Sequence, residues 1–564
     1  MAKLPARRAA RMAALAVSGI TVITAALLLA PPVRSESDLK IESVPGEFVV
    51  QLKPSANFDG FERQALSLGA EVVENIRGDL ILVRAAGESS KASGIAAQKF
   101  AAQLSTLSMV EVAEPNYIYR AVKLPNDPDL QKLWGLKNSG AADTAGARGL
   151  AGIDVGAESA WEITTGSKSV IVAVIDTGID FGHPDLKAQA WVNEKEKNGK
   201  AGVDDDSNGY VDDVNGFNFA GNKGDSTDDN GHGSHCAGTI GAKGDDGKGL
   251  VGVNWDVSMM AVKFLDKSGS GTLANAVKSI DYARINGAHI MSNSWGGGGP
   301  SEVLKKSIED ANAAGILFVA AAGNETNNND ANPTYPAGYE VENVLSVAAI
   351  DNRGALASFS NWGQKTVHVA APGVNIVSTV PGAKYDSYSG TSMATPHVAG
   401  IAALLLAQNS STTHLELKQR IIESARPLYN LKTRVSSGGI ADAYYALSGL
   451  TPPADPNDPS RLPNNTPYKY SSDHPYKENT KTEHRITISG AKKLAVRFSQ
   501  FETEPGYDTV SFFDGKGAFV GSLSGKQEPG ITSPLIHGDT LVIKFSSDET
   551  VNAYGFDVES VLSE

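Results

Sequence analysis

The sequence predicts an α/β fold, with a central parallel sheet covered by helices on both faces. A small ferredoxin-like α/β unit precedes it and a small β-sandwich follows it. Three observations predict this. The chain has 564 residues, which at about 150 residues per domain corresponds to three or four units. Its middle alternates continuous apolar runs with helical segments, and its C-terminal part has short alternating segments. A linker rich in Pro, Asn and Asp, residues 449–470, separates these parts, so we expect units at 36–121, 122–448 and 471–564.

The composition is that of a folded, acidic protein. Lys and Arg number 50 and Asp and Glu number 64, which gives a formal net charge of −14. This charge argues against nucleic acid or an anionic membrane as the main partner. The single cysteine, Cys236, excludes a disulfide within the chain and a cysteine-rich zinc site.

The N-terminus has the layout of an export signal. Four basic residues lie within the first eleven, and an uncharged apolar run follows over residues 12–30. We expect residues 1–35 to be a signal peptide and the protein to be secreted or extracytoplasmic. The apolar run is also just long enough to span a bilayer, so a retained membrane anchor is the alternative.

The first folded unit, residues 36–121, alternates strand and helix patterns. The expected order is strand, helix, two strands, helix and strand, at 47–53, 58–68, 71–76, 79–83, 96–107 and 110–119. This βαββαβ order is the ferredoxin-like layout.

The central unit contains continuous apolar strands, at 170–175 and 315–322, and a long helix over 391–408. Such strands are typical of a parallel sheet that is covered on both faces. After the linker, short alternating segments such as 494–498 and 541–545 predict a β-sandwich.

Three polar residues of the central unit have the environments that nucleophilic catalysis requires. Asp176 follows a buried strand, His232 lies between glycines, and Ser392 lies at the start of the long helix. A serine hydroxyl is a weak nucleophile until a neighbouring base removes its proton. An imidazole can do this near neutral pH, and a buried carboxylate orients the imidazole and stabilises its protonated form.

Six motifs surround these residues in the same order as in a known family. They are Asp176-Thr-Gly-Ile-Asp180, His183-Pro-Asp-Leu186, Gly231-His-Gly-Ser-His-Cys-Ala-Gly238, Asn293-Ser-Trp-Gly296, Ala322-Gly-Asn324 and Gly390-Thr-Ser-Met-Ala-Thr-Pro-His-Val-Ala-Gly400. With them the chain resembles the subtilisin-like serine proteases, in which the triad follows the order Asp, His, Ser. The resemblance implies a subtilisin-like sheet and a serine endopeptidase.

The resemblance also assigns roles to individual residues. It implies that Ser392 is the nucleophile, His232 the general base and then acid, and Asp176 the orienting carboxylate. Asn324 matches the asparagine whose amide stabilises the oxyanion, together with the backbone N–H of Ser392.

Substrate binding is implied in the same way. Ser294, Trp295 and Gly296 match the strand that pairs with an extended substrate and forms a wall of the first specificity pocket. Thr334 falls where a very small residue would give a deep pocket, so we expect a modest preference for smaller apolar side chains.

Cys236 follows His232 by four residues, as in the proteinase K branch of the family. We interpret it as a small buried hydrophobic residue rather than a catalytic group. Its place in the motif predicts that mercurials inhibit the enzyme by distorting the structure beneath His232.

An acidic loop resembles the first nine positions of a calcium-binding loop. Its oxygen-bearing residues alternate, and Gly209 permits a sharp turn. The expected ligands are Asp204, Asp206, Asn208, Tyr210 and Asp212, with Asp213 as the alternative to Asp212. An acidic loop that is merely solvated would show the same composition.

A second calcium site is implied by the resemblance alone. Asp185 and Asp246 match its carboxylate and amide positions. Calcium would stabilise the native state of a secreted chain without disulfides by mass action.

The N-terminal unit resembles the inhibitory prodomain of the family, through residues 46–53 and 110–117. We expect it to assist folding, to act as an intramolecular inhibitor, and to be removed by self-cleavage between about Tyr119 and Asn126. A permanent α/β domain is the alternative.

The C-terminal unit resembles a CUB domain, without the cysteines that many such domains carry. The matching positions are Phe501 to Glu504, Tyr507 and Asp508, Phe513 to Gly515, Phe545 to Asp548, and Gly555 and Phe556. Glu504, Asp508 and Asp548 are candidate ligands for one further calcium ion.

These inferences predict a secreted, calcium-stabilised serine endopeptidase that is made as a self-processed zymogen. Its partners would be polypeptide substrates and its own prodomain, with no nucleic acid, and we expect a monomer. Two alternatives stay open. One is a catalytically silent surface-binding protein, in which the last domain is the functional part. The other is a processing protease with a single partner.

Overall fold

The structure is a computed structural model of the chain. It describes residues 43–118, except 55, 92 and 93, and residues 124–564. The signal peptide or anchor expected at 1–35 lies outside the described residues. Within the described part, no helix has both the length and the hydropathy that a membrane crossing requires.

The chain forms two compact units, of which the first ends at residue 118. Its elements are β1 Ser43–Leu52, α1 Phe58–Ser67, β2 Ala70–Arg77, β3 Leu80–Ala85, α2 Gly94–Ser105 and β4 Val110–Tyr117. The strands form an antiparallel sheet in the order β2-β3-β1-β4, which is the ferredoxin-like arrangement expected from the sequence. The helices α1 and α2 cover the face of the sheet that carries Phe48 and Val50.

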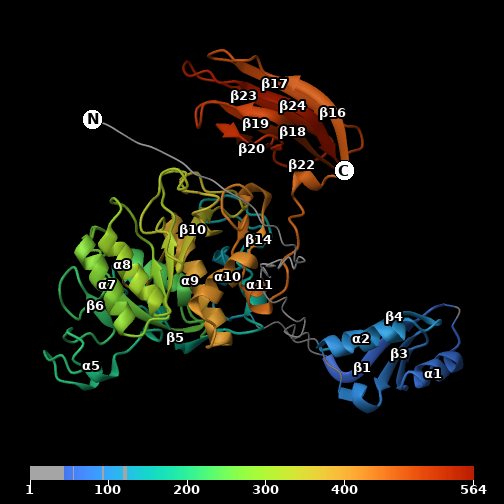
Figure 1. The fold of residues 1–564 in the computed structure, drawn as a ribbon, viewed down its shortest axis with the longest axis horizontal. Helices are drawn as coiled ribbons and strands as arrows, with labels where there is room; N and C mark the ends of the chain where they lie inside the picture. The colour runs from blue at the N-terminus through green and yellow to red at the C-terminus, as the bar shows by residue number, and fades with distance from the viewer. Residues whose placement is uncertain (1–42, 55, 92–93, 119–123) are drawn as a thin grey trace, which may run out of the picture. The chain divides into compact units, whose positions relative to one another are not determined.

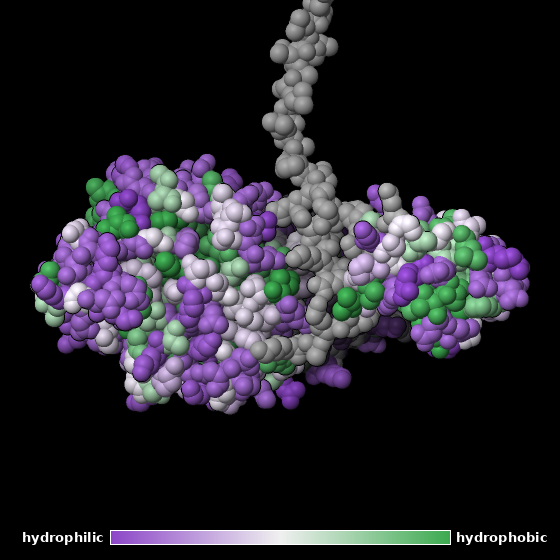
Figure 2. Space-filling view, turned by 90° about the horizontal axis from the view of Figure 1, so that it is seen from below, coloured by the Kyte–Doolittle hydropathy of each residue, from purple (hydrophilic) through white to green (hydrophobic). Residues whose placement is uncertain are grey.

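The opposite face of this sheet is open and partly apolar. Val49 lies opposite Leu82 on β3, and Gln51 lies opposite both Leu80 and Val112. Val49, Leu80 and Leu82 are half-buried, and Val112 is exposed. Figure 2 shows apolar surface among polar surface on this unit, which lies at the right of the view. The sheet therefore has one packed face and one face without a cover among the residues of its own unit that the structure describes.

The second unit, residues 119–564, contains a nine-stranded sheet in the order β14-β15-β11-β10-β9-β8-β5-β7-β6. Its strands are parallel from β6 to β15, and only β14 is antiparallel to its neighbour. The bounds are β5 Gly166–Asp176, β6 Gly216–Asn218, β7 Asp256–Lys263, β8 Ile290–Asn293, β9 Leu317–Ala321, β10 Val344–Ile350, β11 Val369–Pro372, β14 Arg426–Pro427 and β15 Gly439–Ile440. A separate hairpin joins β12 Ile376–Val380 to β13 Lys384–Tyr388.

Helices cover both faces of this sheet, as expected (Figure 1). On one face lie α3 Ala157–Ala160, α6 His232–Gly241, α9 Thr391–Gln408, α10 His414–Glu423 and α11 Ala443–Ser448, and on the other lie α7 Leu273–Ile285 and α8 Glu302–Ala313. Two short helices, α4 Pro184–Lys187 and α5 Glu194–Asn198, lie in the connection after β5. Along β5, Val172 and Val174 pack under the first set of helices and Ala173 and Ile175 under the second. A strand that is buried on both faces must be apolar throughout, which explains the continuous run seen in the sequence.

Two expected central elements have nearly the predicted bounds. The strand expected at 315–322 is β9, and the helix expected at 391–408 is α9 with the same ends. Among the residues that the structure describes, short 3-10 helices lie at Gly87–Lys91, Leu130–Lys132, Tyr429–Leu431 and Pro459–Arg461.

The C-terminal part is a sandwich of two antiparallel sheets. The strands are β16 Asn464–Ser471, β17 Lys481–Thr487, β18 Lys493–Glu502, β19 Thr509–Asp514, β20 Phe519–Leu523, β21 Lys526–Gln527, β22 Ile536–His537, β23 Thr540–Ser546 and β24 Gly555–Ser563. One sheet has the order β16-β24-β18-β21, with β22 beside β18, and the other has the order β17-β23-β19-β20. Phe498, Phe512, Phe545 and Phe556 fill the core between them.

The expected linker, residues 449–470, is longer than the structure allows. The first strand of the sandwich, β16, already starts at Asn464 and pairs with β24. The sequence predicts a linker that extends too far because Pro467, like most prolines between two units, indicates a linker rather than a strand. This proline is tolerated here because β16 is an edge strand, where one side of the backbone needs no ladder partner.

Candidate active site

The carboxylate and the imidazole expected to work together are in direct contact. Asp176 is the last residue of β5 and is fully buried, and His232 is the first residue of α6. His232 Nδ1 lies 2.8 Å from Asp176 Oδ1 and 3.0 Å from Oδ2, and Thr177 N donates to Oδ1 over 2.7 Å. The carboxylate therefore holds the imidazole by Nδ1 and leaves Nε2 as the nitrogen that faces other groups.

A second buried carboxylate, Asp228, organises the turn before His232. Its Oδ1 accepts from Thr177 Oγ1 at 2.8 Å and from Gly231 N at 2.9 Å, and its Oδ2 accepts from Ser234 N at 2.9 Å. Asp228 thus caps the start of α6 from four residues upstream, since Gly231 has no side chain to do so. The sequence analysis missed this residue, although an acidic residue just before a helix start is a capping signal.

Both carboxylates act on the proton affinity of His232. Burial lowers the pKa of His232, but the charge and hydrogen bond of Asp176 and the charge of Asp228 outweigh it. The pKa is therefore raised from its ordinary value. The site thus stabilises the imidazolium that forms when His232 accepts a proton.

Ser392, the second residue of α9, is held by a reciprocal pair of hydrogen bonds with Ser294. Ser392 Oγ donates to Ser294 O over 3.1 Å, and Ser294 Oγ donates to Ser392 O over 2.9 Å. The second bond is needed because Pro396, four residues on, has no N–H for the Ser392 carbonyl. The thiol of Cys236 also donates to this carbonyl, over 3.4 Å.

Cys236 itself is fully buried under the site. Burial, with the charge of Asp176, raises the pKa of its thiol well above the ordinary value. A neutral thiol that donates to a backbone carbonyl fits the packing interpretation of Cys236 and not a catalytic one.

Asn324 follows β9 and is oriented by Thr391, the first residue of α9. Its Oδ1 accepts from Thr391 N at 2.9 Å and from Thr391 Oγ1 at 3.0 Å. With its oxygen used in this way, the amide NH2 is the group left to donate to a ligand. Thr391 is a second residue that the sequence analysis did not single out.

The expected substrate strand comes directly after β8. Ser294 is buried against Ser392, and Gly296 packs against another loop, where a Cβ on Gly296 would lie 3.2 Å from Tyr335 O and 3.8 Å from Thr334 Cγ2. Trp295, between them, packs into the cluster beneath α7 and α8. The structure therefore brings Gly296 and Thr334 close together.

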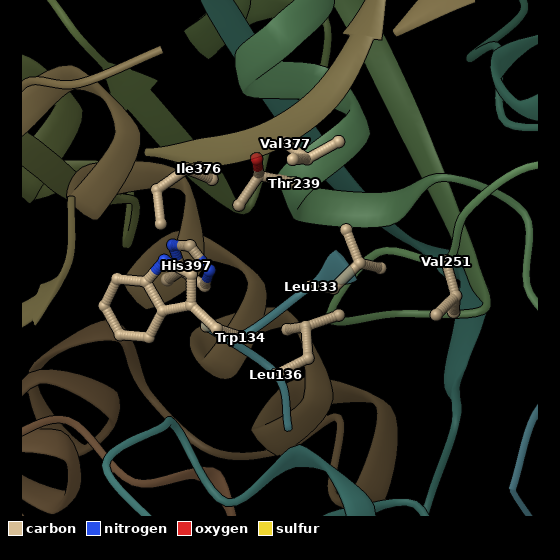
Figure 3. A pocket seen from close by; sticks show the side chains of 9 residues that line it. Leu133, Trp134, Leu136, Thr239, Val251, Ile376, Val377 and His397 are labelled. Atoms are coloured by element: carbon tan, nitrogen blue, oxygen red, sulfur yellow. The ribbon is translucent and has the colours of Figure 1, made fainter. Parts of the chain in front are cut away.

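A small cavity is lined by residues of α6, α9 and β12 together with residues 133–136 (Figure 3). Trp134 and the ring of His397 line it together with Leu133, Leu136 and Val251. Burial lowers the pKa of His397 to about 4, and its Nδ1 lies 2.8 Å from Met393 O. Because its lining is largely apolar and its histidine is neutral, we interpret it as a packing defect behind α9.

The acidic loop brings three carboxylates together. Oxygens of Glu196, Asp206 and Asp213 all lie within 4.8 Å of one another. Asp213 is fully buried and accepts from Tyr282 OH at 2.6 Å and from Asn208 Nδ2 at 2.9 Å. Burial, with the charges of Asp206 and Glu196, raises the pKa of Asp213 to about 6. A cluster of this kind suits a hard cation with oxygen ligands.

The loop does not gather all of its expected ligands at this point. Asp212, which has a φ of 55°, turns its carboxylate to Gly202 N at 2.9–3.0 Å, so its neighbour Asp213 joins Asp206 instead. Asp204 accepts from Gly209 N at 2.8 Å within the loop. Tyr210 packs its ring 4.8 Å from that of Phe217, which leaves only its carbonyl for a ligand role. Glu196, from α5, comes from outside the motif and could not be read from the loop spacing.

The second expected site gains a residue as well. Asp185 and Asp127 are both buried, and Oδ1 of each has no hydrogen-bond partner among the described residues. Burial, with the nearby charge of Asp246, raises the pKa of both. Two buried carboxylates that each keep one oxygen without a donor among the described residues, and that both feel the charge of Asp246, fit a bound cation.

The sandwich contains the third group, Glu504, Asp508 and Asp548, whose oxygens lie within 4.8 Å of one another. Asp508 is fully buried, accepts from the hydroxyl of Tyr476, and accepts from Asp548 N at 2.8 Å. Burial, with the charges of Asp548 and Asp508, raises the pKa of Glu504. This group also fits a cation with oxygen ligands.

Comparisons with known proteins agree with this geometry. The model described as "Subtilase family" matches residues 167–455, and the model described as "CUB domain" matches residues 461–559. A "Thermophilic serine proteinase" of Bacillus sp. (strain AK1) is 35% identical over 408 residues, 72% of this chain and 88% of that protein. "Subtilisin DY" of Bacillus licheniformis is 39% identical over 46% of this chain and 85% of its own length.

A relative of similar identity occurs outside the bacteria named above. "Subtilisin-like protease 1" of Plasmodium vivax is 38% identical over 294 residues, 49% of this chain but only 47% of its own length. The chain therefore belongs to the subtilase family of serine peptidases, with a CUB domain at its C-terminal side, and it hydrolyses peptide bonds.

Proposed function

We propose that this peptidase is an exported, calcium-stabilised endopeptidase that is made as a self-processed zymogen and uses Asp176, His232 and Ser392. The observation that carries the catalytic assignment is the contact of His232 Nδ1 with Asp176 at 2.8 and 3.0 Å. The helix α6, which begins at His232, packs against α9, whose second residue is Ser392. In the reaction, the Ser392 hydroxyl leaves the Ser294 carbonyl, gives its proton to His232 Nε2, and attacks the scissile carbonyl. His232 then protonates the leaving amine, and water hydrolyses the acyl-enzyme.

The tetrahedral intermediate carries an oxyanion that needs preorganised donors. We assign the Asn324 amide and the Ser392 N–H to this role. Thr391 holds the Asn324 carboxamide by its oxygen. The amide is therefore already oriented when negative charge develops on the substrate oxygen, and no reorganisation is needed. Loss of this donor in Asn324→Ala is expected to lower kcat by about 10²–10³-fold.

The substrate is proposed to bind as an extended strand beside Ser294, Trp295 and Gly296. The proximity of Thr334 to Gly296 supports a pocket of limited depth, since Thr334 carries a branched side chain where a smaller residue would leave more room. We therefore expect smaller apolar residues to be preferred at the position before the scissile bond.

The N-terminal unit is proposed to be the inhibitory prodomain, removed between about Tyr119 and Asn126. Its open, partly apolar sheet face supports a unit that works against another protein surface. Export is proposed from the basic residues and the apolar run at 12–30. The CUB domain is proposed to bind substrate or a surface, or to stabilise the precursor.

Calcium is proposed at three places, held in part by residues outside the expected motifs. The first set is Glu196, Asp206 and Asp213, with Asp204, Asn208 and the Tyr210 carbonyl nearby. The second is Asp127, Asp185 and Asp246, and the third is Glu504, Asp508 and Asp548. The raised pKa of Asp213, Asp127, Asp185 and Glu504 supports all three, because ionised carboxylates crowded in this way need a cation. When bound, calcium would supply charge balance and stability and would take no part in peptide hydrolysis.

The experiment that tests this proposal is the intact mass of the secreted protein with calcium present. Wild type and Ser411→Ala, which changes an exposed serine away from the site, are expected to lose the segment up to about residue 120. Ser392→Ala is expected to keep it. If Ser392→Ala is trimmed like wild type, self-maturation is wrong. If none is trimmed, the catalytically silent binding protein becomes the better account.

A further inference from the structure

A buried asparagine, Asn361, holds the loop that carries Asn324. It lies between β10 and β11, far from Asn324 in the sequence, and is fully buried. Its Oδ1 accepts from Glu325 N and from Asn327 N, both at 2.9 Å. Its backbone N donates to Gly323 O over 2.9 Å. Asn361 therefore grips the loop on both sides of Asn324.

The amide of Asn361 reaches further, to the residue expected in the specificity pocket. Its Nδ2 donates to Ala322 O at 3.1 Å, to Thr334 Oγ1 at 3.1 Å and to Glu325 Oε2 at 2.7 Å. The hydroxyl of Thr334 in turn donates to Asn329 Oδ1 over 3.2 Å. Every donor and acceptor of the Asn361 carboxamide is thus used within one loop.

Gly323 shows how tightly this arrangement is packed. It has a φ of 112°, and a Cβ there would lie 2.3 Å from Asn361 Nδ2 and 2.6 Å from Glu325 Oε2. The amide and the carboxylate therefore occupy the space that any other residue would need directly before Asn324. Because Asn361 is fully buried, breaking its bonds to the backbone of this loop leaves unpaired polar groups, so its carboxamide has one preferred arrangement.

We propose that Asn361 is a positioning residue for the reaction, which sets the place of Asn324 and the distance of Thr334 from Gly296. This inference rests on the proposed role of Asn324 in binding the oxyanion. Asn361 touches neither the substrate nor the reacting atoms and acts through the 322–334 loop. A displacement of about 1 Å of a catalytic group can cost about 10²-fold in rate, so its loss is expected to appear in kcat.

The test uses the hydrogen bond from Asn361 to Glu325, whose polarity can be reversed. In Asn361→Asp a carboxylate oxygen replaces Nδ2 and faces the Glu325 carboxylate, so we expect kcat per titrated active site to fall about 10–100-fold. Adding Glu325→Gln supplies an amide donor opposite the carboxylate that Asn361→Asp introduces. The double variant is expected to have a kcat at least about tenfold higher than Asn361→Asp alone. Glu325→Gln alone is expected to change kcat less than about threefold.

Asn343→Asp is the matched control for burial. Asn343 is also fully buried and donates to two carbonyls, Ile316 O at 2.9 Å and Ile308 O at 3.4 Å, but it precedes β10 at the opposite edge of the sheet. It is expected to lower the unfolding temperature and to leave kcat per active site within about threefold. If Asn361→Asp behaves like this control, or if Glu325→Gln gives no rescue, the positioning role is wrong.

Two further variants keep the result interpretable. If Asn361→Asp does not accumulate, Asn361→Ser removes both amide donors and is expected to show the same fall in kcat; an unchanged kcat would overturn the proposal. Asn324→Ala, measured in parallel, separates failure of the oxyanion assignment from failure of the positioning role of Asn361. If it keeps wild-type kcat, the oxyanion assignment itself fails. If it loses activity while Asn361→Asp does not, only the role of Asn361 fails.

Discussion

Buried carboxylates in the catalytic unit have two opposite environments. At the catalytic edge, Asp176 and Asp228 are surrounded by protein donors: His232 and Thr177 N for the first, and backbone N–H groups with the Thr177 hydroxyl for the second. At the two proposed calcium sites of this unit, carboxylates crowd together with raised pKa, and Asp127 and Asp185 each leave an oxygen without a partner among the described residues.

The difference indicates what each carboxylate is for. A carboxylate that orients a catalytic group must be fixed by the fold itself, so the protein supplies its hydrogen bonds. At the proposed calcium sites the protein satisfies some carboxylate oxygens, such as those of Asp213, but Oδ1 of Asp127 and Oδ1 of Asp185 have no donor among the described residues. Carboxylates left in this state keep lone pairs for a cation, and the protein is less stable until the cation binds. Substitutions in the two sets should therefore separate catalysis from stability.

The largest expected effect is in catalysis. Asp176→Asn keeps an acceptor for Thr177 N but no longer stabilises the His232 imidazolium or its tautomer, so kcat is expected to fall about 10⁴-fold. Stability should change by less than about 1 kcal/mol, because the side chain has nearly the same shape and keeps one acceptor oxygen. The variant would be matured by an unrelated cysteine protease, which is then inhibited, and assayed on a peptide with Ser392→Ala as the blank. A large fall in the unfolding temperature of Asp176→Asn would contradict the separation of catalytic carboxylates from stabilising ones.

The reverse effect is expected from removal of calcium. A site held at 100 times its dissociation constant contributes about 2.7 kcal/mol. A chelator should therefore lower the unfolding temperature of the Ser392→Ala protein by about 5–10 °C. The inactive background prevents self-digestion from mimicking unfolding. If the chelator leaves the unfolding temperature unchanged, these carboxylates bind no stabilising calcium and are merely solvated.

A comparison of substitutions at Asp213 and Asp212 tests the calcium assignment within one loop. Asp213→Asn removes a carboxylate of the cluster and is expected to reduce the calcium-dependent rise in unfolding temperature by about half. Asp212→Asn changes a carboxylate that accepts from Gly202 N and should keep most of the rise. Both should keep kcat within about threefold when calcium is saturating. Equal effects of the two changes would contradict the assignment of Asp213.

The same contrast explains what the sequence could and could not predict. The strand 315–322, the helix 391–408 and the order of the N-terminal elements follow from local patterns of apolar residues, and the structure has them. Asp176, His232, Ser392 and Asn324 lie inside recognisable motifs, because their neighbours are constrained by the same chemistry.

Residues that act across the fold escaped sequence reasoning. Glu196 reaches the acidic loop from α5, and Asn361 reaches the residues on both sides of Asn324 from beyond β10. Asp127, from before the sheet, feels the charge of Asp246 as Asp185 does. No spacing in the sequence records these approaches, which depend on how the strands are ordered. The choice of Asp213 over Asp212 depends on one left-handed backbone angle and was equally out of reach.

The smallest expected effect concerns pH. His232 must be neutral to accept the Ser392 proton, so activity is lost as pH falls through its pKa, which Asp176 and Asp228 raise. Asp228→Asn removes one of these charges but keeps an oxygen for Gly231 N. The pKa of His232 should fall, and the acid limb of kcat/KM should move to lower pH by up to about one unit.

Asp225→Asn is the control, because it removes an equal charge from an exposed residue of the same loop, which Lys223 Nζ contacts at 2.9 Å. It should leave the acid limb in place. Because Asp228 is buried, the shift should also persist at high salt, which screens exposed charges. An acid limb that stays in place in Asp228→Asn, or moves to higher pH, would mean that Asp228 shapes the turn without acting on the charge of His232.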